Sequence, residues 1–382
     1  RDYYASRGLG DVYKRQGFAA CGKLFSSLFG VKYLTAMIIS AIVIVAYTTL
    51  GGFLAASTTD FIQSIIMSVA LIVVLIFGVE TAGGIGAVIH NASELPGYLS
   101  MTLSYDVNTG KAAPYSALTI VSTAAWGLGY FGMPHILLRF MAIEDEKKLK
   151  LSRRVATIWV VISLFVAVFI GVIGYTMSKV GALEMLTGSN SETIIVKISA
   201  LLSQHGVIFA LLAGVILAGI LASTMSTSDS QLLAASSAVS SDILGAFRKD
   251  SSNKNGSMAA ARITLLVISV VAAFIARNPD SSVFAIVSFA WAGFGAAFGP
   301  VVLFSLFWKR TSKWGALAGM VCGGSMVFIW KYLIRPLGGI WNIYELLPAF
   351  LIACAAIVIV SLLTPKPSKE IEEEFDRVAQ MK

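Results

Sequence analysis

The chain has 382 residues, of which 57% are hydrophobic and only 13% are charged, and its net charge is +8. Soluble domains carry roughly 25% charged residues, so this composition excludes an ordinary soluble globular protein. Apolar runs of about 20 residues, long enough to cross a bilayer, recur along the whole length. The sequence therefore predicts an all-α polytopic protein of the cell membrane, with the lipid bilayer as its surroundings.

The basic residues gather between the apolar runs instead of following one face of the protein. Clusters of this kind mark the cytoplasmic loops of membrane proteins, and they give no indication of a nucleic-acid partner. The three clusters are Lys147, Lys148, Lys150, Arg153 and Arg154; Arg248, Lys249 and Lys254; and Lys309, Arg310 and Lys313.

The chain divides into three parts by composition. Residues 1–16, RDYYASRGLGDVYKRQ, are polar and aperiodic, and we expect a spurious or unstructured segment there, with a genuine short arm as the alternative. The transmembrane part is expected over 17–364, beginning with the remnant of a span, and residues 365–382 form a charged cytoplasmic tail.

Nine full spans are predicted from the apolar runs, and the segment 80–115 is expected to be an outer loop with short helices. The predicted spans are 33–56, 58–79, 116–142, 155–178, 206–236, 258–277, 282–308, 313–334 and 344–364.

The third span contains WGLGYFGMPH (126–135), with three glycines and a proline in ten residues. Backbone groups freed at mid-membrane are tolerated only where they are buried or line a cavity, and transporters use such discontinuous helices as binding sites. We expect 127–132 to be non-helical or distorted, with Trp126 and Tyr130 on the same side of the break. A simple kink is the alternative. The expected half-helices are 116–126 and 134–142.

The fifth span carries a row of hydroxyl groups. Ser223, Ser226, Thr227 and Ser230 follow the i, i+3, i+4, i+7 spacing of one helix face. Hydroxyl and backbone oxygens suit a hard cation such as Na⁺, so the row predicts a cation site. Close helix packing, or bonding of the hydroxyls back to carbonyls, is the alternative.

Two carboxylates accompany this row. Asp229 lies in the same span but about 120° from the hydroxyls, and Asp60 begins the second span. An acid inside a membrane is a candidate functional group, whereas Asp60 could also serve a helix N-terminus. We expect their Cα atoms to lie within roughly 12 Å of each other and to frame a second cation or proton site.

The seventh span, FAWAGFGAAFGPVVLFSLFWKR (289–310), has a small-xxx-small spacing at Gly295 and Gly299, which predicts close helix contact, with a gating hinge as the alternative. The histidines show no metal-site spacing with cysteines or acids. No phosphate loop, nucleophile elbow or cysteine-pair signature appears, so we expect neither an enzyme nor a cofactor.

Four stretches together resemble the sodium:solute symporter family, and within it the sodium/proline symporters. They are WGLGYFGMPHILLRFMAI, STSDSQLLAASSAVSSDI, FAWAGFGAAFGPVVLFSLFWKR and GGFLAASTTDFIQ. The resemblance runs from about residue 17 to the tail. It implies the leucine-transporter fold of two inverted five-helix repeats, here incomplete because the first spans, including the broken first core helix, have no counterpart.

For the substrate, the resemblance implies that Trp126, Tyr130 and Pro134 line the site and that Tyr47 belongs to the substrate path. Met133 stands where some members have glutamine, a difference that affects substrate contacts.

For the ion, the resemblance implies that Ser226 and Thr227 bind the coupling Na⁺ and that Ser223 adds its carbonyl. Asp60 matches an acid of a second cation site in some sugar and sialic-acid members of the family.

The function implied by the resemblance is Na⁺-coupled symport of L-proline into the cell by alternating access, with Na⁺ as coupling ion and no cofactor. The alternative is symport of another small carboxylate such as pantothenate.

Overall fold

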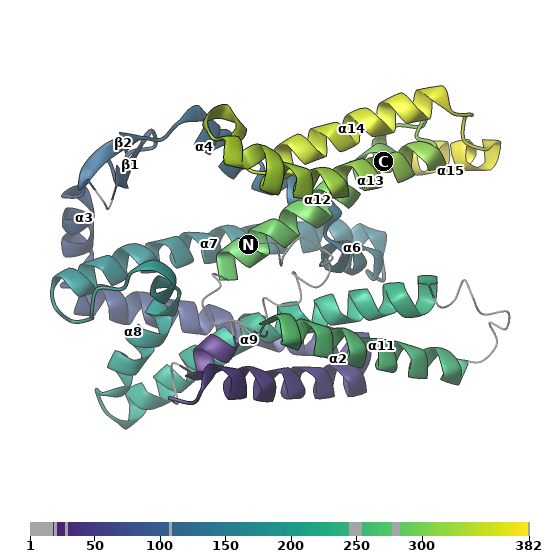
Figure 1. Cartoon of the computed structure of the whole chain (residues 1–382). Helices are drawn as coiled ribbons and strands as arrows, with labels where there is room; N and C mark the ends of the chain where they lie inside the picture. Colours follow the sequence, from purple (N-terminus) through teal and green to yellow (C-terminus); the bar gives the residue numbers. More distant parts are fainter. Residues whose placement is uncertain are drawn as a thin grey trace. The chain divides into compact units, whose positions relative to one another are not determined.

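The computed structural model describes residues 18, 21–26, 30–106, 109–243, 254–276 and 283–380 (Figure 1). The segment 1–16 and the basic cluster at Arg248 and Lys249 therefore lie outside the described residues. The chain forms two compact units, each considered by itself. The described parts are the N-terminal unit, 18–114 and 143–283, and the C-terminal unit, 115–142 and 284–380.

The N-terminal unit consists of long helices and one small hairpin. Its elements are α2 (Tyr33–Thr81), α3 (Ile85–Ser93), β1 (Leu103–Asp106), β2 (Lys111–Pro114), α7 (Leu149–Lys179), α8 (Ile194–Ser203), α9 (Val207–Ser237), a π-helical turn (Ala238–Ile243) and α11 (Lys254–Ala276).

Helix α2 is two helices joined at Gly52. This glycine has φ 61° and ψ −159°, a conformation that a residue with a Cβ rarely adopts, so the helix is interrupted there. The two apolar arms are Tyr33–Gly52 and Ala56–Thr81. The two predicted spans are confirmed, and the junction lies a few residues earlier than the expected one near residue 57.

Long helices pack side by side within this unit. Helices α2 and α9 run along each other, and a Cβ added at Gly219 of α9 would lie 2.7 Å from the Cβ of Ala70. In contrast, α7 presents Ile158, Phe165 and Val168 to the outside. Apolar side chains exposed along a helix of 31 residues are what a lipid environment requires.

The segment 80–115 contains an element that the sequence analysis missed. Strands β1 and β2 pair antiparallel, with Leu103 opposite Pro114 and Asp106 opposite Lys111. The amide of Gly110 donates to the Asp106 carbonyl at 2.8 Å, and Gly110 has φ 66°. The expected short helix is present as α3, but the rest of this loop is a hairpin.

The C-terminal unit contains the broken span and the last helices. Its elements are α4 (Ala117–Ala124), α5 (Trp126–Gly129), a 3₁₀ turn (Tyr130–Gly132), α6 (Pro134–Met141), α12 (Val283–Phe307), α13 (Lys313–Ile329), a π-helical turn (Trp330–Ile334), 3₁₀ turns (Arg335–Leu337 and Gly339–Trp341), α14 (Leu346–Leu363) and α15 (Lys369–Gln380).

Glycines on one face of α13 allow α14 to approach closely. A Cβ at Gly319 would overlap the Ile357 side chain, and a Cβ at Gly315 would overlap the Ser361 hydroxyl. Ser312 caps α13 by accepting the Gly315 amide at 3.0 Å, and its own amide donates to Ser361 Oγ at 3.1 Å. The turn between α12 and α13 is therefore fixed to the end of α14.

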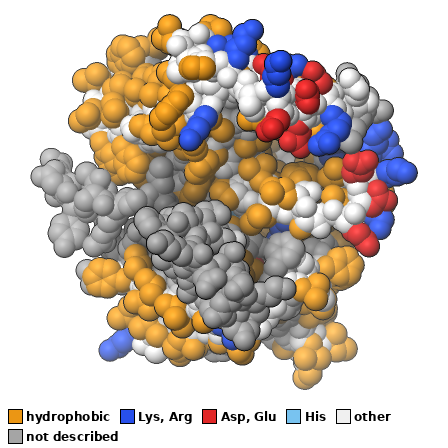
Figure 2. Space-filling model, turned by 90° about the vertical axis from the view of Figure 1, so that its right-hand side faces the viewer, with side chains coloured by type: hydrophobic (Ala, Val, Ile, Leu, Met, Phe, Trp, Pro, Cys, Tyr) orange, Lys and Arg blue, Asp and Glu red, His pale blue; other side chains and the backbone are white. Residues whose placement is uncertain are grey.

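The charged tail folds as helix α15, which is joined to the same turn. Lys309 Nζ donates to Asp376 at 2.5 Å, and this bond raises the pKa of Lys309, so the lysine stays charged. Arg310 donates to the Thr364 carbonyl at 2.8 Å. On the side of the molecule drawn in Figure 2, acidic and basic side chains are interspersed on one part of the described surface, and apolar side chains gather on other described parts.

Seven helices among the described residues are long and apolar enough to cross a membrane. The other two predicted spans differ from single long helices. The span at 116–142 is divided into short helices, and the one at 258–277 has an apolar part of only Ala259–Phe274. The chain is a multi-pass membrane protein.

Candidate functional site

The span at 116–142 is interrupted, as predicted, but at a different residue. Met133 is extended, with φ −82° and ψ 110°, and Pro134 begins α6 at a position where its missing amide costs nothing. Residues Gly127 to Gly129 are α-helical and 130–132 form a 3₁₀ turn, so the distortion predicted for 127–132 is limited to its second half. The first half of the span extends to Gly132, and the extended residue Met133 separates it from α6.

Two of the three glycines, Gly129 and Gly132, serve close packing. A Cβ at Gly129 would overlap the Trp291 indole, and one at Gly132 would lie 2.8 Å from the Gly299 nitrogen and 2.9 Å from the Gly295 Cα. The backbone of the broken span thus lies directly against the backbone of α12. The packing expected of Gly295 and Gly299 is confirmed, and its partner is the broken span.

Aromatic rings surround Trp126. The rings of Phe284, Trp291 and Tyr344 stack on its indole, with centroids 5.5, 5.9 and 5.7 Å away. Trp291 also donates its Nε1 hydrogen to the Trp126 carbonyl at 2.9 Å. The sequence analysis missed Trp291, although its place beside Gly295 in FAWAGFG was a usable signal. Ring stacking and a hydrogen bond to its backbone carbonyl therefore both fix the position of Trp126.

The other residues expected to line the substrate site differ in exposure. Tyr130 is 50% exposed and sets the edge of its ring against Trp291, at 4.8 Å between centroids. Pro134 is half-buried, whereas the Met133 side chain is fully buried in the hydrophobic core. Among these residues, Tyr130 is the one whose ring is most available to a ligand.

The hydroxyl row of α9 places three oxygens together. Ser226 Oγ and Thr227 Oγ1 both donate to the carbonyl of Ser223, each at 3.1 Å. Hydroxyls that bond back to a carbonyl one turn earlier are common in helices. The same three oxygens also form a group of hard ligands of the kind that a cation such as Na⁺ prefers.

Asp229 lies on α9 with its side chain fully buried, and its partner comes from α2. Tyr47 Oη donates to Asp229 Oδ2 at 2.8 Å, and Ser230 Oγ donates to Oδ1 at 3.4 Å. Asp60 acts electrostatically on both Asp229 and Tyr47. Tyr47, predicted for the substrate path, thus contacts Asp229, and both its substrate role and the 12 Å separation of Asp60 and Asp229 remain predictions.

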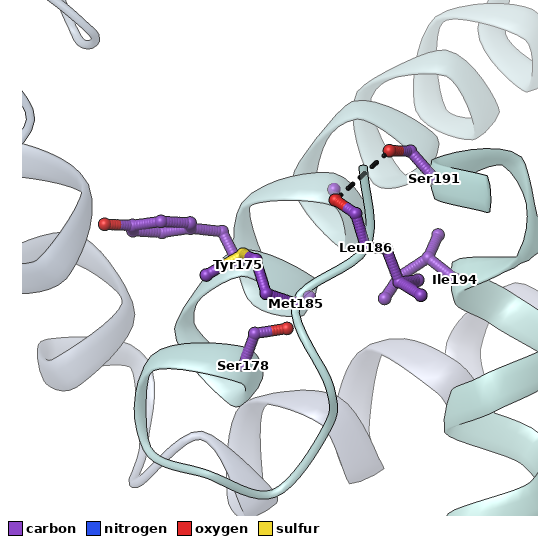
Figure 3. A pocket seen from close by; sticks show the side chains of 8 residues that line it. Tyr175, Ser178, Met185, Leu186, Ser191 and Ile194 are labelled. Carbon is purple, nitrogen blue, oxygen red and sulfur yellow. Dashed lines mark hydrogen bonds between the residues drawn. The ribbon is translucent and has the colours of Figure 1, made fainter. Parts of the chain in front are cut away.

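A further pocket in the N-terminal unit contains none of the predicted site residues. It lies between the end of α7 and the start of α8, and its volume is about 170 Å³. Tyr175 and Met185 line it, and Ser191 Oγ donates to the Leu186 carbonyl (Figure 3). Its lining is mostly apolar, and it holds no group of polar ligands like the one on α9.

The fold is that of a known class of membrane transporter. The structure superposes on a solved Na⁺-coupled sialic acid symporter, captured in a substrate-bound outward-open state, with a TM-score of 0.72. The likeness covers 94% of this chain and 74% of that one at 17% sequence identity. It shows an all-α, leucine-transporter-type architecture, as the resemblance implied.

The sequence comparisons identify the family. The model of the sodium:solute symporter family matches residues 12–323. Similar proteins include the osmoregulated proline transporter OpuE of Bacillus subtilis, 37% identical over 94% of this chain and 69% of the relative. The sodium/proline symporter of Haemophilus influenzae is 39% identical over 96% and 71%, and the high-affinity proline transporter PutP of Bacillus subtilis is 38% identical over 95% and 72%. The chain belongs to the sodium:solute symporter family.

Proposed function

We propose that the protein takes up L-proline into the cell together with Na⁺, by alternating access. The observation that supports Na⁺ binding is the convergence of the Ser226 and Thr227 hydroxyls on the Ser223 carbonyl. The choice of L-proline as substrate is supported by relatives that are named as proline transporters and sodium/proline symporters. Symport couples the two because binding of the ion favours the state that binds the substrate.

The ion site consists of the three oxygens on α9. Na⁺ would take the Ser223 carbonyl and the two hydroxyls as ligands, and the hydroxyl hydrogens would turn away from the carbonyl that they now approach. Asp60 and Asp229, with Tyr47 between α2 and α9, form the candidate second cation or proton site. A cation there would reduce the repulsion between two carboxylates in a medium of low dielectric constant.

The substrate site consists of the interrupted span in the C-terminal unit. The proline carboxylate would lie near the start of α6 at Pro134, where the helix dipole is positive. The pyrrolidine ring would pack on Tyr130, whose ring is half exposed, with Trp126 behind it. Na⁺ and proline then leave together when the transporter opens inward.

Uptake in proteoliposomes tests the proposal. Radiolabelled proline should accumulate only when an inward Na⁺ gradient is present, and an excess of unlabelled proline should suppress the accumulation. Excess pantothenate should leave it unchanged. Uptake that persists without Na⁺, or that pantothenate abolishes, would contradict the proposed coupling or the proposed substrate, respectively.

Tyr130→Ala should raise the KM for proline about tenfold, because the variant loses most of an aromatic surface that the ring of the substrate would cover. The Na⁺ dependence should stay as in the wild type, since Tyr130 is not on α9. Initial rates of uptake over a range of proline concentrations measure this change. The control is Tyr98→Ala, which removes an exposed tyrosine of the outer loop and should leave the KM unaltered. Wild-type kinetics in Tyr130→Ala would place the substrate elsewhere.

Asp229→Asn should change the stoichiometry, because it removes one charge from the group formed with Asp60 and Tyr47. We expect the variant to transport about one cation fewer per proline. Parallel measurement of labelled Na⁺ and proline fluxes gives the ratio. Tyr47→Phe is the matched control, since it removes the hydrogen bond and keeps both carboxylates. An unchanged ratio in Asp229→Asn would remove the second site from the proposal.

A further inference from the structure

Tyr344 is a buried tyrosine of the C-terminal unit that the proposed function does not use. It lies just before α14, and its side chain is 7% exposed. Its ring stacks on Trp126 with an interplanar angle of 15°, the smallest among the rings that stack on this indole. Trp126 belongs to the interrupted span, more than two hundred residues earlier in the chain.

Three contacts fix Tyr344 from three different segments. Its hydroxyl donates to the Ser288 carbonyl of α12 at 2.6 Å. Its backbone amide donates to Ser122 Oγ of α4 at 3.1 Å. The third contact is the ring of Trp126. The backbone of Tyr344 is bound to α4 and its side chain contacts α5 and α12, so the residue has little freedom to move and fixes the position of the Trp126 ring that it touches.

The next residue, Glu345, adds an ionic anchor. Its side chain is only 1% exposed, and it accepts a hydrogen bond from Arg335 Nη1 at 2.8 Å and lies 3.7 Å from Lys331 Nζ. Arg335 also donates its Nε hydrogen to Asn342 Oδ1 at 3.0 Å. A buried carboxylate is stable only when it is paired in this way, so the short segment before α14 is held against the end of α13.

Lys331 is in turn held by an aromatic ring. Its Nζ lies 3.8 Å from the centroid of the Phe289 ring, in a cation–π contact. Phe289 follows Ser288, whose carbonyl accepts the Tyr344 hydroxyl. The Lys331 ammonium group and the Tyr344 hydroxyl therefore contact adjacent residues of α12.

We infer that Tyr344 is a positioning residue for substrate recognition: it fixes the Trp126 indole, which stacks on Trp291, the ring that in turn contacts Tyr130. This inference rests on the proposed function, because Trp126 and Tyr130 recognise a substrate only if the interrupted span binds one. It assigns a specificity role to the segment before α14, where the sequence shows no functional motif. A residue that merely filled space would affect the amount of folded protein and leave the KM unchanged.

Tyr344→Phe tests the inference, because it keeps the ring and removes only the bond to Ser288. We expect the KM for proline to rise about threefold to tenfold, the range that loss of one neutral hydrogen bond allows. The maximal rate and the Na⁺ dependence should change by less than about twofold. The matched control is Tyr332→Phe, which removes a hydroxyl from a tyrosine whose ring packs on Phe289. A KM equal to the wild-type value in Tyr344→Phe would overturn the inference.

A spectroscopic measurement separates this inference from the proposed function. In protein labelled with fluorotryptophan, the Trp126 resonance is assigned by its loss in Trp126→Phe. Tyr344→Phe should shift or broaden that resonance, and Tyr332→Phe should leave it in place. An unmoved resonance would overturn the positioning role even if proline is transported. Failure of the wild type to transport proline would instead contradict the proposed function.

Discussion

Replacing Thr227 by alanine should lower the apparent affinity for Na⁺ by about tenfold or more, because the variant loses one of the three oxygens that converge on α9. Ser226→Ala should act in the same direction. At saturating Na⁺, proline uptake should recover at least in part in both variants, since the substrate residues are unaltered. Initial rates of proline uptake measured against Na⁺ concentration give the affinity.

The matched control is Ser228→Ala, in the same turn of the same helix. Ser228 is buried, and its hydroxyl donates to the Thr224 carbonyl at 2.7 Å, so it has the same back-bond but does not point to the Ser223 carbonyl. Its replacement should leave the Na⁺ dependence unchanged. If Ser226→Ala and Thr227→Ala behave like this control, the hydroxyl row serves helix packing and binds no ion.

The transmembrane helices could be predicted from the sequence because each depends on a local property. An apolar run of sufficient length must be helical in lipid, so the arms of α2, and α7, α9 and α14, follow from composition alone. The exact ends depend on backbone conformation. Gly51 and Gly52 adjoin in the sequence, and only the structure shows that Gly52 has the positive φ that interrupts α2.

The candidate site could be predicted only in part, for a different physical reason. The spacing of Ser223, Ser226 and Thr227 is local to one helix, and their oxygens do converge. The bond from Trp291 to Trp126 joins residues 165 apart, and the bond from Tyr47 to Asp229 joins residues 182 apart. Such pairs depend on which helices pack together, and periodicity within one helix contains no information about that.

The glycines of the interrupted span also have a role that depends on which helices pack together, and the local sequence alone does not predict that role. A cluster of glycines can indicate an unwound backbone or a close contact, and both readings are consistent with the letters WGLGYFG. The contact partner decides between them, and it lies in α12 at Gly295 and Gly299. The extended residue between the two halves is therefore Met133, because the residue before a proline is biased towards an extended conformation.

Gly132→Ala should reduce both the thermal stability of the protein and its proline uptake severely. The added Cβ would lie 2.8 Å from the Gly299 nitrogen and 2.9 Å from the Gly295 Cα, and it would overlap the Phe294 carbonyl. These are backbone atoms of α12, which cannot rotate away as a side chain does. Overpacking costs about 1–3 kcal/mol even where side chains can adjust, so we expect a cost at the upper end of this range or beyond it.

Gly127→Ala is the decisive comparison, because Gly127 lies in α5, directly before the 3₁₀ turn that contains Gly132, and a Cβ added there would meet nothing within 4 Å. Alanine is a better helix former than glycine by about 0.5–1 kcal/mol, so this variant should be as stable as the wild type or slightly more stable. Melting temperatures of the detergent-solubilised variants and their uptake in proteoliposomes test both expectations. Equal loss in the two variants would mean that the span needs glycine for flexibility. Loss in Gly132→Ala alone would mean that it needs glycine for contact with α12, and the packing geometry requires this second result.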